Sequence, residues 1–293
     1  MKRIALYDVD SKIPNLALMK LAAYHKRRGD TVETYFPLML DQYDKIYASK
    51  VFSDSDGSGL VPGAMEIGGS GWDLSVELPP EIERMAPDYS LYDYTRSIGF
   101  AMRGCRFNCS FCVVPGKEGK PQPVSTIGEI WTNRGSDFII LLDNDFFGNP
   151  EWEDRISEIQ ALNLKVCFSQ GLNIRTITTN QARALAESRF SNISGKFKQV
   201  HFAWDRMRDE ALIMKGIQTC MDVGLLPYQM AFYVLIGYDT THDENMYRVN
   251  LLKEIGCDPF VMPIDKDDPY QKKFARWVNM RSTFHVTDWG DYK

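Results

Sequence analysis

The chain has 293 residues, of which 44% are hydrophobic and 25% are charged, and its formal net charge at pH 7 is −5. This length and composition are typical of a globular protein with one large α/β domain or two smaller ones. No apolar run approaches a bilayer span, and the negative charge argues against broad non-specific binding to nucleic acid. Six cysteines, three of them close together, indicate metal ligation rather than a disulfide framework. We therefore expect a cytoplasmic protein without membrane association.

Residues 1–94 show the alternating pattern of a small doubly wound (Rossmann-like) α/β region. The opening segment MKRIALYDVD predicts a strand rather than a signal peptide. Pro14 opens a helix that Gly29 ends, and apolar spacing puts His25 on the inner face of that helix. We therefore expect His25 to be packed or partly exposed. Strands are expected at residues 4–7, 31–35 and 45–49.

Residues 95–265 alternate short apolar strands with amphipathic helices. Thr126, Thr178 and Thr241 each precede Glu or Gln at capping-box spacing, which predicts a helix start at each position. Strands that alternate with helices in this way form a parallel sheet. The remaining segment, 266–293, is a C-terminal extension that we expect to be a solvated charged helix. Strands are expected at residues 98–102, 138–142, 166–168, 199–203, 231–236 and 260–262.

Three cysteines lie within eight residues, Cys105, Cys109 and Cys112, directly after the first strand of this series. A structural zinc site needs four protein ligands, but the next cysteine is Cys167 and the next histidine is His201. A cluster that only transfers electrons normally takes four cysteines. Three thiolates suit three irons of a 4Fe-4S cluster and leave the fourth iron open to a small ligand.

The Cys-x3-Cys-x2-Cys spacing, with Phe111 before the third cysteine, resembles the signature of the radical S-adenosylmethionine (radical SAM) superfamily. The resemblance implies a partial (β/α)6 TIM-like barrel over residues 95–265, preceded by the Rossmann-like region. It implies that SAM chelates the open iron and that Phe111 lies near the adenine. It also implies an external one-electron reductant, flavodoxin- or ferredoxin-like. SAM would then be cleaved to a 5′-deoxyadenosyl radical that abstracts hydrogen from the substrate.

The identity of that substrate stays open between a nucleotide, a nucleic acid and a peptide. The alternative function is a non-catalytic Fe-S protein on the same scaffold, with its open iron used for sensing or electron relay. Release of 5′-deoxyadenosine from SAM distinguishes the two.

Polar residues follow the later strands, where βα barrels carry their catalytic groups. By position, the resemblance gives Asp143, Asn144 and Asp145 the SAM amino group, although the family's Gly-Gly-Glu is absent; the alternative is an Asx-type turn that caps the next helix. Ile236 lies in the segment that packs beside adenine in the family, although an ordinary buried strand has the same pattern. The residues after the third strand offer donors and acceptors to the SAM carboxylate and ribose, or, for the arginine, a surface salt bridge. They are Ser169, Gln170, Asn173 and Arg175.

The first region also resembles, in truncated form, the cobalamin-binding domain of one radical SAM branch. It lacks the Asp-x-His-x-x-Gly signature of cobalt ligation, so we do not expect bound cobalamin. Residues 1–104 contain no cysteine, which disfavours methylthio transfer. The segment Gly68-Gly69-Ser70-Gly71 predicts a tight turn or a close approach to a ligand. The remaining cysteines are expected to be buried structural residues: Cys167, Cys220 and Cys257.

Overall fold

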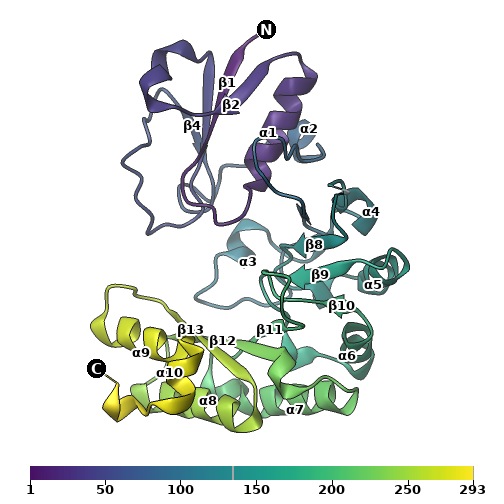
Figure 1. The fold of residues 1–293 in the computed structure, drawn as a ribbon, viewed down its shortest axis with the longest axis vertical. Helices are drawn as coiled ribbons and strands as arrows, with labels where there is room; N and C mark the ends of the chain where they lie inside the picture. Colours follow the sequence, from purple (N-terminus) through teal and green to yellow (C-terminus); the bar gives the residue numbers. More distant parts are fainter. Residues whose placement is uncertain (134, 293) are drawn as a thin grey trace. The chain divides into compact units, whose positions relative to one another are not determined.

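The computed structural model describes residues 1–133 and 135–292, which fold into two compact units. The first consists of Met1–Ile98 with Gly128–Ser136, and the second of Gly99–Ile127 with the chain from Asp137 onward. Both are mixed α/β structures built mainly on parallel strands, as the sequence predicts (Figure 1). In the ranges that the structure describes, no helix is long and apolar enough to span a bilayer.

The first unit is built on one four-stranded parallel sheet. Its elements are β1 (Arg3–Asp8), α1 (Leu16–Arg27), β2 (Thr31–Thr34), the 3-10 helix η1 (Pro37–Gln42), β3 (Lys45–Ser49), β4 (Glu66–Gly68) and α2 (Pro80–Glu83). The strand order is β2-β1-β3-β4, so the direction of winding reverses at β1. Asn15, rather than Pro14, caps α1 by accepting a hydrogen bond from the Leu18 amide at 3.2 Å.

The two faces of this sheet are covered differently. On one face, α1 and α2 pack Leu18, Leu21 and Ile82 against Ile4 and Leu6. On the other face, hydrophobic residues of η1 and of loops pack against the strands, and none of the described residues in this cluster belongs to an α-helix. The strand order is therefore that of a doubly wound sheet, but α-helices cover only one of its faces.

The strands of the second unit form two parallel sheets and a short antiparallel pair. They are β5 (Ser97–Gly99), which the unit boundary crosses, β6 (Met102–Arg103), β7 (Gln122–Pro123), β8 (Phe138–Leu141), β9 (Lys165–Phe168), β10 (Arg189–Phe190), β11 (Val200–Ala203), β12 (Met230–Ile236) and β13 (Asp258–Pro263). One sheet has the order β10-β9-β8-β5 and the other β11-β12-β13, while β6 pairs with β7. Every expected strand is present, the first split into β5 and β6. In the described residues the sheets do not close into a barrel.

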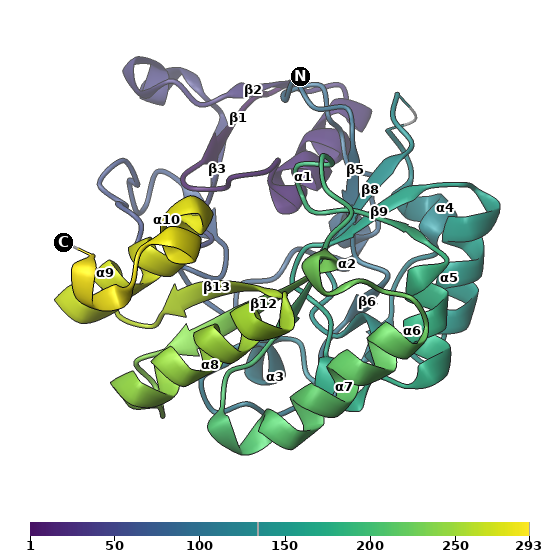
Figure 2. The same ribbon diagram turned by 60° about the horizontal axis from the view of Figure 1, so that its bottom comes forward.

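Helices follow most of these strands, and Figure 2 shows α5 to α8 in a row along the second unit. The helical elements are α3 (Val114–Lys117), α4 (Ile127–Ile130), η2 (Phe146–Gly148), α5 (Trp152–Ala161), η3 (Ile174–Thr176), α6 (Thr179–Ala186), η4 (Met207–Asp209), α7 (Glu210–Asp222), η5 (Pro227–Gln229), α8 (His242–Ile255), α9 (Pro269–Asn279), α10 (Arg281–Val286) and η6 (Trp289–Asp291). The predicted capping boxes at Thr178 and Thr241 are formed. The helix predicted from Thr126 is shorter than expected: α4 is a single turn, and the amide of its first residue, Ile127, donates to the Glu158 carboxylate at 2.6 Å.

The C-terminal extension differs from the solvated helix that its charged residues suggest. Phe274, Trp277 and Phe284 are at most 3% exposed and pack against one another. The Trp277 indole N–H donates to the Thr287 carbonyl at 2.9 Å, and α9 packs along β13. The expectation of a solvated helix is therefore wrong: aromatic residues at helical spacing give α9 a buried face.

Candidate functional site

The three clustered cysteines lie on one loop of the second unit, residues 104–119, which we call the cysteine loop. All three are free thiols; Cys105 and Cys109 are half-buried and Cys112 is exposed. Gly104 begins the loop with φ +84°, and a Cβ there would lie 2.3 Å from the Lys120 carbonyl oxygen. Glycine is therefore required where the chain enters the loop.

The three thiols are close enough to influence one another's ionisation. Burial raises the pKa of Cys105 to about 11, and the charges of Asp145, Cys109 and Cys112 raise it further. Burial also raises the pKa of Cys112, with Cys109 adding to the effect. A bound metal cation lowers the pKa of a thiol instead, because thiols bind metals as thiolates.

Within the described residues, no group of three or more His, Cys, Asp or Glu side chains is already arranged to hold a metal ion. The donors themselves suit a 4Fe-4S cluster, since three free thiols lie on one loop and interact electrostatically. Cys167, Cys220 and Cys257 are buried, at 2% exposure or less, as expected.

Asp143 connects the end of β8 to the chain that leads into the cysteine loop. Its two carboxylate oxygens accept hydrogen bonds from the amides of Ala101 and Met102, at 2.8 and 3.1 Å. The side chain is 2% exposed, and burial raises its pKa to about 7 although both amides act to lower it. Asp143 therefore fixes the approach to the loop.

Asn144 reaches the other end of the loop through Glu118. The Asn144 side-chain amide donates to the Glu118 carboxylate at 3.0 Å. The same carboxylate accepts the Gly104 amide at 3.0 Å and forms an ion pair with Arg103 at 3.0 Å. Glu118 thus joins the two ends of the cysteine loop, a role that the sequence pattern did not reveal.

Asp145 holds the middle of the loop through Arg106. The Arg106 guanidinium donates to both carboxylate oxygens, Nε to Oδ2 at 2.7 Å and Nη2 to Oδ1 at 2.9 Å. Asp145 is 1% exposed, so this is a bidentate ion pair with one buried partner. A Cβ on Gly148 would lie 2.2 Å from Asp145 Oδ2 and 2.8 Å from Arg106 Nε, so a glycine is needed beside the pair.

Asp143, Asn144 and Asp145 therefore all tether the cysteine loop. Asp145 precedes η2 without capping it, so the Asx-type alternative does not describe that residue. Contact between these three side chains and the SAM amino group stays a prediction, and each side chain already has a hydrogen-bond partner in the protein.

Phe111, which is expected near the adenine, contacts a residue that lies just beyond the end of β12. The Phe111 ring packs edge-on against Tyr238, with ring centroids 5.4 Å apart. Tyr238 lies two residues beyond Ile236, which is fully buried at the last position of β12. The Arg206 guanidinium lies over the Phe111 ring, 5.5 Å from its centroid. The loop thus reaches the strand end where the sequence analysis placed adenine.

The four residues predicted after β9 are not equally placed for binding. The Ser169 hydroxyl donates to the Leu141 carbonyl at 2.9 Å, whereas Gln170 is exposed. The Asn173 side chain accepts the Arg175 amide at 3.1 Å and caps η3. The Arg175 guanidinium pairs with Asp209 at 3.0 Å, consistent with the salt-bridge alternative.

Arg175 nevertheless belongs to the site, because its guanidinium lies over the Phe107 ring of the cysteine loop, 4.6 Å from the centroid. The structure therefore places Arg175 beside the loop while its charge is balanced by Asp209.

Asp205, which follows β11, and Arg248 on α8 form a charged group that was not among the predicted ligands. Burial raises the pKa of Asp205, while Arg248, Arg175 and Arg206 act to lower it. Arg248 is fully buried and donates to the carbonyls of Trp204 and Leu235 at 2.7 and 2.9 Å. The position of Asp205 directly after a predicted strand was the only sequence signal for this group.

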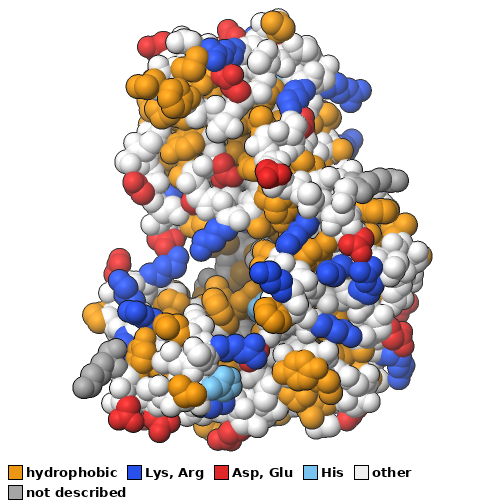
Figure 3. Space-filling model, viewed as in Figure 1, with side chains coloured by type: hydrophobic (Ala, Val, Ile, Leu, Met, Phe, Trp, Pro, Cys, Tyr) orange, Lys and Arg blue, Asp and Glu red, His pale blue; other side chains and the backbone are white. Residues whose placement is uncertain are grey.

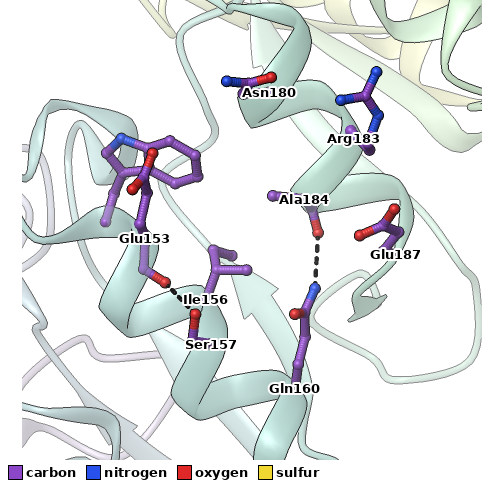
Figure 4. A pocket seen from close by; sticks show the side chains of 9 residues that line it. Glu153, Ile156, Ser157, Gln160, Asn180, Arg183, Ala184 and Glu187 are labelled. Carbon is purple, nitrogen blue, oxygen red and sulfur yellow. Dashed lines mark hydrogen bonds between the residues drawn. The ribbon is translucent and has the colours of Figure 1, made fainter.

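A separate hollow of about 270 Å³ lies on the outside of the second unit, between α5 and α6 (Figure 4). Gln160 crosses one side of it and donates to the Ala184 carbonyl at 3.5 Å. No residue of the cysteine loop lines this hollow. Its lining consists of Trp152, Glu153, Ile156, Ser157, Gln160, Asn180, Arg183, Ala184 and Glu187.

The first unit uses its polar and glycine residues internally. Both ring nitrogens of His25 have partners, Nδ1 with Asp30 at 2.9 Å and Nε2 with the Tyr47 hydroxyl at 3.1 Å. A Cβ on Gly69 would lie 2.2 Å from the Lys50 carbonyl oxygen. The glycine-rich segment therefore closely approaches the protein's own backbone, which accounts for its glycines without a ligand.

Comparison with protein-family models gives no match, and comparison with curated proteins gives none either. A functional assignment must therefore be argued from the residues of the site.

Proposed function

We propose that this chain is a radical SAM enzyme whose cysteine loop holds a 4Fe-4S cluster through Cys105, Cys109 and Cys112. The observation that carries the proposal is the presence of three free, mutually interacting thiols on one loop that follows the first strand of the series. When bound, the cluster and SAM would supply reductive cleavage of SAM and abstraction of hydrogen from a substrate. The two parallel sheets of the second unit would then correspond to a partial (β/α)6 barrel.

The protein's own contribution in this proposal is to orient the cofactors. The ion pair between Arg106 and Asp145 fixes the loop between its first two cysteines. Phe111 and Tyr238 offer two rings for the adenine, and Arg175 offers a guanidinium for the SAM carboxylate. The predicted contacts of Ser169, Gln170 and Asn173 with the ribose belong to the same proposal.

The proposal also sets the surroundings of the enzyme. Free thiols and a reducible cluster need a reducing compartment such as the cytoplasm, and turnover needs an external one-electron donor of the flavodoxin or ferredoxin type. Cobalamin is not part of the proposal, because the cobalt-ligation signature is missing from the first region; both ring nitrogens of His25 have partners in the protein.

The test is anaerobic reconstitution with iron and sulfide, followed by incubation with SAM and dithionite. We expect a four-iron electron paramagnetic resonance signal, about four irons per chain and release of 5′-deoxyadenosine. Cys109→Ala should lose the iron and the product together. Cys220→Ala is the matched control, because Cys220 is a buried thiol on α7, away from the loop.

Each alternative has its own result. A Cys109→Ala protein that keeps a normal four-iron signal would show that the ligands lie elsewhere. A fully loaded wild-type cluster that releases no 5′-deoxyadenosine would favour the non-catalytic sensor or relay.

A further inference from the structure

Three rings from three neighbouring strands of the second unit lie on the same face of one sheet. His201 on β11 stacks on Tyr233 of β12, with ring centroids 4.8 Å apart and an interplanar angle of 11°. Tyr233 in turn meets Phe260 of β13 edge-on at 5.9 Å, and the two residues are paired in the parallel ladder. We call His201, Tyr233 and Phe260 the ring row.

The face that carries the ring row is only partly covered, unlike the opposite face. On the opposite face, Phe202, Val234 and Val261 are at most 1% exposed. On the ring-row face, Phe260 is 44% exposed and Met262, two residues further along β13, is 45% exposed. A contiguous exposed strip of this kind on a strand is typical of a binding surface.

His201 adds a polar group to this otherwise apolar face. Among the described residues its ring has no hydrogen-bond or ion-pair partner, and its observed contact is the stack on Tyr233. Burial lowers the pKa of His201, so the ring is neutral at pH 7 and offers one donor and one acceptor. A purely aliphatic ligand would not use these groups, whereas the polar edge of a heteroaromatic ring would.

Arg206 supplies a positive charge near the ring row. Ala203 is the ladder partner of Tyr233 at the end of β11, the Trp204 amide donates to the Tyr233 carbonyl at 2.8 Å, and Arg206 follows two residues later. In the described part of the chain no carboxylate forms an ion pair with Arg206, whereas Arg175 is paired with Asp209. Figure 3 shows Lys and Arg side chains among hydrophobic ones on one face of the second unit. Arg206 is therefore available for an anionic group.

We propose that the ring row and Arg206 bind the substrate and that this substrate is a nucleotide. The base stacks on the exposed ring of Phe260, with its polar edge on the side of the row that holds Tyr233 and His201, and the phosphate lies at Arg206. Because it names the substrate class of the same site, this inference rests on the proposed function.

The test is isothermal titration calorimetry on the full chain, reconstituted anaerobically but without SAM or reductant. The probes are the four common nucleoside 5′-monophosphates and the corresponding nucleosides. We expect at least one monophosphate to bind more tightly than its nucleoside. Phe260→Ala should weaken binding of both about tenfold, because base stacking is lost. Arg206→Gln should weaken only the monophosphate, to the level of the nucleoside.

Matched controls exist for both variants. Phe197 is 62% exposed in the same unit and Arg208 is exposed near Arg206, so Phe197→Ala and Arg208→Gln should bind as the wild type does. Circular dichroism establishes that each variant is folded. Equal affinities for Phe260→Ala and Phe197→Ala would overturn the inference.

Two further results would also overturn it. One is equal binding of nucleosides and monophosphates. The other is loss of binding in Phe111→Leu while Phe260→Ala binds normally, which would place the base at the Phe111 ring instead. Because no SAM is cleaved in this titration, a chain that cleaves SAM but binds no nucleotide contradicts this inference alone. A chain that binds nucleotide but cannot hold a cluster contradicts the proposed function alone.

Discussion

The two units place polar residues after parallel strands in the same way, yet they use these residues differently. In the first unit, Asp10 accepts the amides of Val51 and Phe52 at 2.7 and 2.8 Å. The side-chain amide of Asn15 there donates to the hydroxyls of Ser11 and Ser49, each at 2.9 Å. The polar side chains after the strands of the first unit are thus hydrogen-bonded to other groups of the same unit.

In the second unit the strand-end groups are only partly used by the protein itself. Asp143, Asn144 and Asp145 hold the cysteine loop, but in the described residues the three thiols form no disulfide. The comparison teaches that a parallel α/β arrangement does not by itself make a binding site. What distinguishes the second unit is which side chains keep donors, acceptors and rings available.

Among the variants that test this comparison between the units, Arg106→Met in the second unit should lose the most stability. Without the guanidinium, the 1% exposed Asp145 carboxylate loses both of its charged donors. Leaving a buried charge unpaired costs about 3 kcal/mol, so the free energy of unfolding should fall by about that amount. Urea denaturation measures the change, and iron content after reconstitution should fall as well.

The control is Arg189→Met, because Arg189 pairs with Asp137 at 2.8 Å where both side chains are more than 40% exposed. An exposed pair contributes about 0–1 kcal/mol, so this variant should be close to the wild type. Equal losses of unfolding free energy in Arg106→Met and Arg189→Met would show that the ion pair between Arg106 and Asp145 stabilises the protein no more than an exposed pair does.

The second-largest loss of stability is expected in the first unit, where the glycine-rich segment approaches the backbone at Lys50. Gly69 has φ +98°, and an added Cβ would overlap the Lys50 carbonyl oxygen at 2.2 Å. Gly69→Ala should therefore lower the free energy of unfolding by about 2 kcal/mol. Gly63 has φ +91°, but a Cβ there would meet none of the described atoms within 4 Å. Gly63→Ala should cost about 1 kcal/mol, from the backbone conformation alone.

The difference between these two glycine variants is the informative quantity in urea denaturation. If Gly63→Ala and Gly69→Ala lose the same stability, then the glycine-rich segment does not depend on close approach to the backbone at Lys50. Such a result would reopen the alternative that the segment serves a ligand.

The sequence predicted the strand series well because it depends on local apolar patterning. The runs at β8 and β12 are buried along nearly their whole length, and the caps at Thr178 and Thr241 involve residues three apart. The tether of the loop was not predicted, because Arg106 and Asp145 are 39 residues apart and local patterning carries no information on such pairs. Local patterning likewise did not show that the Ile127 amide, at the start of α4, donates to Glu158, which is 31 residues along the chain.

In the candidate site too, features set by residues close in the sequence were predicted, whereas contacts between residues far apart in the sequence were missed. Cysteine spacing singled out the cysteine loop as a candidate metal site, and the family resemblance implied that Phe111 and the end of β12 lie near one another; the structure has Phe111 beside Tyr238, two residues beyond β12. The ring row was missed because His201 and Phe260 become neighbours of Tyr233 only through strand pairing.

A smaller effect in the first unit is expected from Asp10→Ala. The variant removes the acceptor of two backbone amides, those of Val51 and Phe52, of which only the first is partly buried. The free energy of unfolding should fall by about 1 kcal/mol, because water satisfies the exposed amide. Asp73→Ala is the control, since Asp73 accepts only from Ser75 in an exposed turn. A loss no greater than that of the control would mean that Asp10 does not close the strand ends.

The smallest change in stability, and the most gradual one with pH, should come from the titration of His201. Burial lowers its pKa in the folded chain, whereas the unfolded value is about 6.5. Between these two pKa values the unfolded chain binds more protons, so the stability of the folded state should fall as the pH drops below about 6.5. His201→Gln removes this titration, so the stability of the wild type relative to the variant should fall as the pH drops below about 6.5.

The measurement is the midpoint of thermal unfolding for both proteins between pH 5 and pH 8. Tyr233, which stacks on His201, has a pKa raised to about 12 by burial and stays neutral throughout this range. The pH dependence of the difference between the two proteins therefore reports His201 itself. Curves that run parallel from pH 5 to pH 8 would mean that the His201 ring is hydrated as freely in the folded chain as in the unfolded one. His201 would then no longer differ from an ordinary exposed histidine, and the polar edge of the ring row would lose its neutral donor and acceptor at mildly acidic pH.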